Sequence, residues 1–361
     1  MKKKICFFSG DITRSGGTER VAVQIANALW EDNAYDICFV SLTEQEREPF
    51  YPLHPDINRY RLGEKWRNPG PGYIPLIGKL RKFLKEKQID IIIDIDIVLD
   101  VLSIPAARRM KTKVVSWEHF NCEFEQQVLY RRLISRLTVH FADYIVTLTE
   151  EDKENYRKIL GRKTQICAIH NMVSKMKQHE NIPRENWIVT AGRLTYQKGI
   201  EYLAQIAVSV LKEHRDWKWL ILGDGEDRNI LEQAISENKL EEQLILKGTV
   251  EQVEWYLNRA KLCVLTSRYE GFGMCLVEAL QMQVPCISFD VKVGPSEIIT
   301  DGENGLLIPP FACEQMVREI NHLIENPDRL QELSEHTMIG LNRYQDEHIV
   351  GKWKKVLNQL S

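Results

Sequence analysis

Short apolar runs alternate with helical stretches along almost the whole chain. In the first half, Val21, Ile25 and Leu29 recur at helical spacing and predict a helix over residues 18–30. The runs that predict strands in this half are 4–9, 35–41, 89–95, 113–117, 144–148 and 165–169. Such alternation is typical of parallel sheets built from βαβ units.

The second half repeats this pattern. Its predicted strands are 187–191, 218–222, 244–247, 262–265 and 285–289, and its predicted helices are 199–214, 227–238, 251–260 and 274–282. Residues 171–185 are polar, contain Pro183 and show no period, so we interpret them as a linker.

A chain of 361 residues is long enough for two domains. We therefore expect two Rossmann-like, doubly wound α/β domains, 1–170 and 186–344, that face each other across a cleft. A C-terminal helix over residues 345–361 can pack back on the first domain. In such sheets ligands bind outside the carboxyl ends of the strands, so functional side chains should directly follow strands.

Composition narrows the class of protein. Hydrophobic residues make up 43% and charged residues 27%, as in ordinary globular chains. No apolar run approaches about 18 residues, so we expect neither a secretory signal nor a membrane-spanning helix. The eight cysteines form no CxxC pair, which favours buried free thiols in a cytoplasmic protein. The net charge is −3, with a basic first half and an acidic second half, and we expect no nucleic-acid partner.

Two loops carry groups suited to a phosphate. Gly16 and Gly17 follow the first predicted strand, so backbone amides can approach a phosphate or a sugar there. A tight turn explains the same glycines, and the lysine of a P-loop is absent. Arg193 and Lys198 precede the helix at 199–214, where they suit a diphosphate or are two solvated cations.

A glycine turn in the second half argues against one class of enzyme. Gly223 and Gly225 follow a predicted strand, but Arg228 stands where a dinucleotide fingerprint needs its third glycine. An NAD-dependent dehydrogenase is therefore disfavoured.

The strongest local pattern surrounds Glu270 and Glu278. The turn between them starts a helix, so its amides at residues 272–274 would be hydrogen-bond donors. Glu270 can accept sugar hydroxyls, and Glu278 can accept both hydroxyls of a ribose. Taken alone, Glu278 is equally well explained as a surface residue of an ordinary helix.

Together these motifs resemble the retaining glycosyltransferases of family four, which adopt the two-domain GT-B fold. The matching elements are the E-x7-E pair, Arg193 with Lys198, the Gly-Asp-Gly turn at 223–225, the D-G-x-N-G turn at 301–305 and the glycine loop at 16–17. The run 289–299 is similar to that of members that build bacterial surface polysaccharides, although their usual proline after Asp290 is missing.

The resemblance implies a reaction and the residues that perform it. The reaction is transfer, with retention and without a metal, of a hexosyl group of the galactose, N-acetylgalactosamine or glucose class. The donor is a nucleotide diphosphate sugar, preferably UDP-linked, and the acceptor is a glycan or a lipid-linked glycan. The implied catalytic residues are Glu270, Arg193, Lys198 and His119, and the implied donor-binding residues are Gly16, Gly17, Gly223, Gly225, Val250, Phe272, Gly273, Met274 and Glu278. No cofactor is expected.

Two features of the first half have competing explanations. His119, after Glu118 at the end of a predicted strand, either touches the donor sugar or is structural. Asp94 and Asp96 resemble the Asp-x-Asp metal element of the other large glycosyltransferase fold, GT-A, but a structural role is favoured because they end an apolar strand.

The segment 73–87 predicts an amphipathic basic helix. Its cations are Lys79, Arg81, Lys82, Lys85 and Lys87. An ordinary surface helix packed on the first sheet is the favoured explanation. The alternative is peripheral contact with an anionic membrane at the inner face of the cell membrane.

Two rival functions stay open. A sugar-nucleotide epimerase uses the same architecture, but the E-x7-E pair argues against it. A catalytically silent GT-B module that binds a glycan or a partner subunit is disfavoured by the intact glutamates and the intact Arg193 and Lys198.

Overall fold

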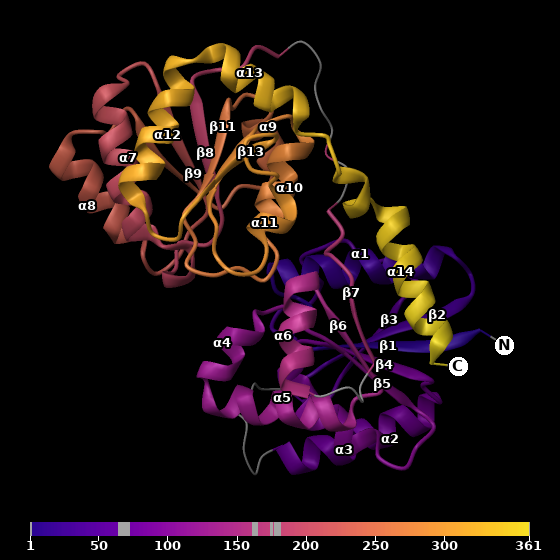
Figure 1. Cartoon of the computed structure of the whole chain (residues 1–361). Coiled ribbons are helices and arrows are strands. Elements are labelled where there is room, and N and C mark those ends of the chain that lie inside the picture. Colours follow the sequence, from indigo (N-terminus) through magenta and orange to yellow (C-terminus); the bar gives the residue numbers. More distant parts are fainter. Residues whose placement is uncertain (1, 64–72, 161–164, 174–175, 177–181, 361) are drawn as a thin grey trace. The chain divides into compact units, whose positions relative to one another are not determined.

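The structure is a computed structural model, and it describes residues 2–63, 73–160, 165–173, 176 and 182–360 (Figure 1). It contains two compact units. The first combines Met1–Met172 with Asp346–Ser361, and the second is Val173–Gln345. Within the described ranges, every helix is too short or too polar to cross a bilayer.

A parallel sheet forms the centre of the first unit. Its strands are β1 (Lys3–Ser9), β2 (Tyr35–Ser41), β3 (Asn58–Arg61), β4 (Ile91–Ile95), β5 (Lys113–Trp117), β6 (Tyr144–Thr147) and β7 (Gln165–Ala168). They lie in the order β3-β2-β1-β4-β5-β6-β7, and the neighbouring pairs are parallel. The strand order reverses between β1 and β4, so the carboxyl edge of these two strands is the topological switch point.

Helices cover both faces of this sheet. They are α1 (Gly17–Glu31), α2 (Ile74–Lys87), α3 (Asp100–Ala107), α4 (Cys122–Gln127), α5 (Leu129–Phe141), α6 (Glu150–Leu160) and α14 (Asp346–Gln359), with a short 3-10 turn, η2 (Ile97–Leu99), before α3. On one face, Leu84 of α2 and Leu102 of α3 share a buried core with Phe8 of β1. On the other, α14 lies beside α1 (Figure 1). Trp353 of α14 packs edge-on against Trp117.

The second unit has a similar sheet. Its strands are β8 (Trp187–Ala191), β9 (Lys218–Leu222), β10 (Leu244–Gly248), β11 (Leu262–Leu265), β12 (Cys286–Phe289) and β13 (Gly305–Ile308). The order is β10-β9-β8-β11-β12-β13, again with parallel neighbours. The switch point therefore lies between β8 and β11.

The helices of this unit also form two layers. They are α7 (Ile200–Glu213), α8 (Arg228–Asn238), α9 (Val253–Leu257), α10 (Met274–Gln281), α11 (Pro295–Ile298), α12 (Cys313–Glu325) and α13 (Pro327–His336), with 3-10 turns η3 (Tyr196–Lys198) and η4 (Leu341–Tyr344). α7, α8 and α12 share a buried core with Trp219 and Ile287 of the sheet. α10 packs against β11 and β12.

The structure confirms the predicted α/β architecture and adds two strands that the sequence did not indicate. Both β3, with the polar sequence Asn58-Arg59-Tyr60-Arg61, and the short β13 lie at a sheet edge. An edge strand has one neighbour and needs no continuous apolar run, which explains the weak signal of β3. In β13 the apolar run covers only Leu306 to Ile308 and is too short to predict a strand. Of the predicted linker 171–185, residues 174–175 and 177–181 lie outside the described residues.

Candidate active site

The switch point of the second unit brings an oppositely charged pair together. Lys198, at the end of η3, follows β8, and Glu270 follows β11. The Lys198 Nζ donates a hydrogen bond of 2.6 Å to Oε1 of Glu270. Because β8 and β11 are hydrogen-bonded neighbours, residues 72 positions apart in sequence meet at one edge.

This pair is mostly shielded from solvent. The Glu270 side chain is 6% exposed and the Lys198 side chain 19%. Burial lowers the pKa of Lys198, but the attraction of Glu270, with a smaller effect of Cys275, outweighs it, so the pKa of Lys198 is raised. Ser267 Oγ also donates to Oε1 of Glu270, at 2.6 Å. With Oε1 occupied by two donors, Oε2 is the oxygen that a ligand hydroxyl would use.

Arg268 braces the loop that carries Lys198. Its Nη1 donates to the Tyr196 carbonyl at 2.6 Å, and its backbone amide donates to the Gln197 carbonyl at 2.8 Å. Its guanidinium lies 3.9 Å from the centroid of the Tyr196 ring. The sequence did not predict this role of Arg268. Its position two residues before Glu270 was the one feature that could have suggested it.

Arg193 is the exposed cation of the site. It precedes Lys198 in the same loop, and its positive charge acts to lower the pKa of Lys198. Among the described residues, no carboxylate forms an ion pair with Arg193. Its guanidinium is therefore available to an anionic ligand.

The Gly-Asp-Gly turn packs directly against the Arg193 loop. A Cβ at Gly223 would stand 1.9 Å from the Gly192 carbonyl oxygen, and one at Gly225 would stand 2.2 Å from that of Leu194. The Leu194 amide donates to the Asp224 carbonyl at 2.9 Å. These glycines thus permit close backbone packing that positions Arg193, while their contact with a donor stays a prediction.

The helix α10 begins at the same edge. Gly273 is its N-cap residue with φ of 97°, a left-handed conformation that favours glycine. The first amides of α10, from Met274 on, have no acceptor within the helix. The Phe272 side chain is buried against Tyr344, with ring centroids 5.4 Å apart, so Phe272 can offer only its backbone to a ligand.

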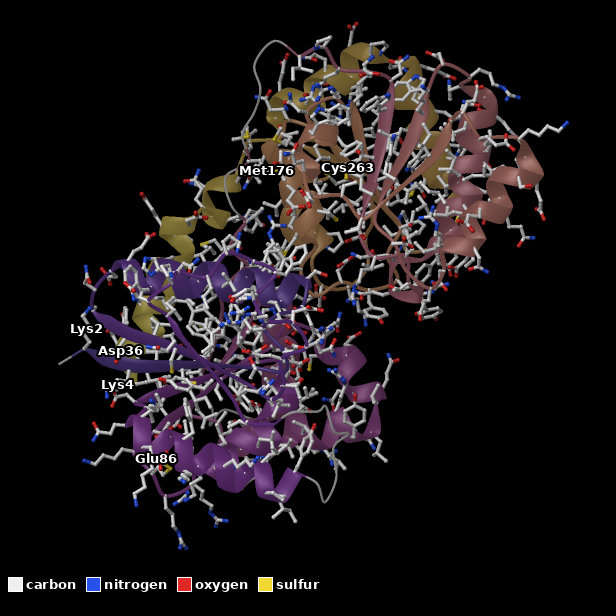
Figure 2. All side chains as sticks on the ribbon, turned by 180° about the vertical axis from the view of Figure 1, so that it is seen from behind. Lys2, Lys4, Asp36, Glu86, Met176 and Cys263 are labelled. Atoms are coloured by element: carbon white, nitrogen blue, oxygen red, sulfur yellow. The ribbon has the colours of Figure 1, made fainter. Side chains whose placement is uncertain are left out.

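Glu278 is buried, which contradicts its interpretation as an ordinary surface residue. It is 6% exposed on α10. Burial raises the pKa of Cys275, which Lys198 lowers and which Glu270 and Glu278 raise, so these three charges surround that thiol. The charge of Glu278 also raises the pKa of Cys263, a residue of β11 (Figure 2).

Two further motifs lie at opposite edges of the sheet: Val250 at the carboxyl edge and the D-G-x-N-G turn, which precedes β13, at the amino edge. Val250, half-buried, follows β10. In the D-G-x-N-G turn, Asn304 Oδ1 accepts from the Thr300 amide and Asp301 Oδ1 from the Leu307 amide, both at 2.9 Å. The latter two contacts shape the entry into β13 and give this motif a structural role.

In the first unit, the start of α1 already carries a negative charge. A Cβ at Gly16 would stand 2.1 Å from Oε2 of Glu19, whereas one at Gly17 would meet nothing within 4 Å. Glu19 is 5% exposed, and its Oε2 accepts from the Thr18 hydroxyl at 2.7 Å. This carboxylate occupies the positive end of the helix dipole and is partly compensated by Arg14, whose Nε lies 3.9 Å from its Oε1, so the helix start suits neutral hydroxyl groups better than a phosphate.

The two carboxylates of the Asp-x-Asp run, Asp94 and Asp96, lie in different environments. Asp94 accepts from the Ser103 hydroxyl and faces Asp100, which accepts from Ser116 Oγ at 2.7 Å. Burial raises the pKa of both carboxyls, that of Asp100 to about 6, so the pair retains a proton at a pH where an exposed carboxyl has lost it. In the described ranges, no group of three or more His, Cys, Asp or Glu could hold a metal ion.

Asp96 lies outside that pair. It adopts φ of 110°, a strained value for a residue other than glycine, and its carboxylate accepts from the Val98 amide at 3.0 Å. Arg131 Nη2 lies 3.9 Å from its Oδ2. Asp96 is thus the carboxylate that ends β4 at the switch point of the first unit.

His119 is a neutral, nearly buried imidazole. It is 6% exposed, and its ring lies 4.4 Å from that of Trp117. Burial lowers the pKa of His119 to about 3, and its Nε2 has no hydrogen-bond partner among the described residues. The neighbouring Glu118 accepts from the Tyr156 hydroxyl at 2.6 Å and the Phe120 amide at 2.8 Å, which assigns Glu118 to the core.

Two family profiles match the chain. The profile of glycosyltransferase family 4 matches residues 15–175, and the profile of group 1 glycosyl transferases matches residues 173–338. The first range includes His119, and the second includes Lys198 and Glu270.

Curated relatives match over nearly the whole chain. An uncharacterized glycosyltransferase of Haemophilus influenzae is 30% identical, covering 98% of this chain and 100% of that protein. The amylovoran biosynthesis glycosyltransferase AmsD of Erwinia amylovora is 28% identical over 98% and 99%. A Campylobacter jejuni α-1,4-N-acetyl-D-galactosaminyltransferase, named for an undecaprenol diphosphate-linked substrate, is 24% identical over 99% and 99%.

A solved structure has the same fold. The Anabaena protein Alr3699/HepE in complex with UDP-glucose superposes with a TM-score of 0.81 at 18% identity, covering 98% of this chain and 99% of that one.

Proposed function

The chain belongs to the group 1 and family 4 glycosyltransferases of GT-B fold, and from this premise we propose that it transfers a hexosyl group from a UDP-sugar to a lipid-linked glycan acceptor with retention. The sugar is of the galactose, N-acetylgalactosamine or glucose class, and the product is a bacterial surface polysaccharide. The observation that carries this proposal is the Lys198–Glu270 pair beside the exposed Arg193 at the switch point of the second unit.

The proposed chemistry depends on the diphosphate leaving group. As the bond between the sugar and the diphosphate breaks, negative charge develops on the diphosphate oxygens. Lys198 and Arg193 would neutralise that charge, and the first amides of α10 would donate hydrogen bonds to it. We propose that no metal ion takes part, because these groups supply the charge that a metal would otherwise provide.

Glu270 and Glu278 would hold different halves of the donor. Glu270 keeps Oε2 for a sugar hydroxyl, and its charge would offset positive charge at the anomeric carbon during front-face attack. Glu278, inside α10, would accept the ribose hydroxyls. In the first unit, neutral His119 would donate or accept one hydrogen bond to the sugar, and the open backbone at Gly17 would admit hydroxyl groups.

The relatives support the substrate classes. AmsD is named for synthesis of a polysaccharide, and the Campylobacter enzyme is named for a lipid-linked glycan and an N-acetylgalactosaminyl group. HepE binds UDP-glucose. The eight free cysteines suit a reducing cytoplasm, where we propose that the reaction occurs.

The donor base is testable by calorimetric titration with UDP, GDP and ADP. We expect UDP to bind most tightly, and we expect the matching sugar nucleotides to be slowly hydrolysed without an acceptor. An enzyme that binds no nucleoside diphosphate would contradict the proposal, and binding without hydrolysis or transfer would favour a silent binding module.

Two further assays address the chemistry. NMR of the product should show the anomeric configuration of the donor. Activity should survive EDTA, whereas a loss that divalent metal restores would return Asp96 to consideration as a ligand.

A further inference from the structure

One face of α5 exposes large apolar side chains. Leu129 is 62% exposed, Leu133 56% and Phe141 65%, with Tyr130 at 48% and Leu137 half-exposed. These five residues, here called the α5 face, lie on one side of the helix at 100° per residue. The opposite side buries Ile134, Ser135, Thr138 and Val139. A surface helix normally directs polar residues outward, so an apolar outer face marks an interaction site.

The surroundings of the α5 face are basic. α5 itself contains Arg131, Arg132 and Arg136 and no acidic residue. Arg136 is exposed beside Leu133, one turn along the helix. α3 packs against α5 (Figure 1), and the exposed cations Arg108, Arg109 and Lys111 follow it. A face of this composition complements an anionic, partly apolar surface.

The helix that the sequence suggested for membrane contact is engaged within the protein. In α2, Lys79 donates to the Leu62 carbonyl, and Arg81 donates to the carbonyls of Ala106 and Arg108. Lys82 forms an ion pair with Glu86, which lies at the outer surface of the first unit (Figure 2). Lys87 lies over the ring of Tyr60. α2 is therefore a surface helix whose exposed cations mostly have partners within the first unit.

The start of α2 nevertheless adjoins the α5 face. Burial, and then the neighbouring Tyr130, raise the pKa of Tyr73, which places the Tyr73 ring close to α5. The next residue, Ile74, is 70% exposed.

We propose that the α5 face docks on an anionic lipid bilayer, with Leu129, Leu133 and Phe141 in the interfacial layer and Arg136 near lipid phosphates. A second copy of this chain is the less suitable occupant, because a symmetric contact would oppose arginines without an acidic partner on α5. Docking rests on the proposed function, since a lipid-linked acceptor would be presented in such a surface.

Co-sedimentation of the full chain with vesicles tests this docking. The vesicles are phosphatidylcholine alone or phosphatidylcholine with phosphatidylglycerol. We expect wild type to bind the anionic vesicles, and Leu129→Ser with Leu133→Ser to lower that binding at least about tenfold, because two apolar anchors are lost. Arg136→Glu should lower it several-fold and make the remainder less sensitive to salt. The matched control is Met338→Ser with Ile339→Ser, which removes two side chains of 49% and 50% exposure from the second unit and should bind as wild type does.

Three outcomes would overturn the docking proposal. The first is equal vesicle binding by the Leu129 and Leu133 double variant, and the second is no binding by wild type. The third is self-association without vesicles that the same double variant abolishes, which would identify a second copy as the occupant. Hydrolysis of UDP-sugar in solution, measured in parallel, should be unchanged in this variant. If the wild type does not hydrolyse UDP-sugar, the result contradicts the proposed function and not the docking proposal.

Discussion

The two sheets reverse their strand order at corresponding places, yet their carboxyl edges differ in charge. In the second unit, Lys198 and Glu270 pair at 2.6 Å and Arg193 stays exposed beside them. In the first unit, the start of α1 carries Glu19, and His119 is neutral. One edge is therefore suited to a charged diphosphate and the other to uncharged hydroxyl groups, which shows that the loops after the strands, not the sheet, determine the chemistry.

We expect the largest effect from replacing Lys198, because its charge distinguishes the carboxyl edge of the second unit from that of the first. In Lys198→Ala, the nearly buried Glu270 would lose its cation and the diphosphate its closest charge, so we expect turnover to fall about 100-fold or more, or about 2.7 kcal/mol. Steady-state kinetics with the preferred UDP-sugar would measure it. The control is Lys212→Ala, an exposed lysine on α7, and equal rates in the two variants would rule out the role assigned to Lys198.

The stability of the first unit should depend on pH through its buried carboxyls, Asp94 and Asp100. The pKa of Asp100 is raised to about 6, so its favourable contribution is complete below its ordinary value near 4 and is lost as pH rises through about 6. Asp100→Asn removes this loss, so the stability of the variant relative to wild type should increase by about 2 kcal/mol from pH 4 to pH 7.

Hydrogen exchange of the β4 and β5 amides would isolate this effect in the first unit. Asp36→Asn, at an exposed position of β2 (Figure 2), should show no such trend. A constant difference between Asp100→Asn and wild type across this pH range would show that the Asp94–Asp100 pair does not share a proton.

The two glutamates of the second unit should be separable. Glu270→Gln keeps the size of the side chain but removes its charge, so turnover should fall about tenfold or more while UDP binding is nearly unchanged. Glu278→Gln should weaken both UDP and UDP-sugar. Calorimetry with UDP and steady-state kinetics would separate the two, and an equal loss of UDP affinity in both variants would refute the assignment.

Arg193 should make the smallest and most salt-sensitive contribution. Because it is exposed, Arg193→Ala should weaken UDP about tenfold at low salt, or about 1.4 kcal/mol, and less at high salt. Uridine should bind as it does to wild type. Arg215→Ala, another exposed arginine of this unit, is the control, and an equal change for UDP and uridine would remove Arg193 from the diphosphate.

The elements of the fold were largely predictable because buried parallel strands read as apolar runs. β8, β9 and β11 match their predicted bounds for this reason. β3 did not, since its residues Asn58 to Arg61 are polar and its position at the sheet edge depends on pairing with β2. Local periodicity contains no information on such pairing.

The site was predictable in its residue types and not in its contacts. The position of Lys198 and Glu270 after strands was evident, but the support from Ser267 and Arg268 was not, because side-chain hydrogen bonds between loops leave no periodic trace. The close packing of Gly223 and Gly225 against the Arg193 loop was likewise not evident, while their contact with a donor stays a prediction.

The sequence by itself determined an alternating α/β chain and the chemical groups that follow each strand, because both are written in neighbouring residues. Only the tertiary structure decided which strands are neighbours. It placed β8 beside β11, so that Lys198 meets Glu270, and it buried Asp94 against Asp100 instead of leaving it beside Asp96. Strand order arises from packing between distant segments, and the charge of each sheet edge follows from that order.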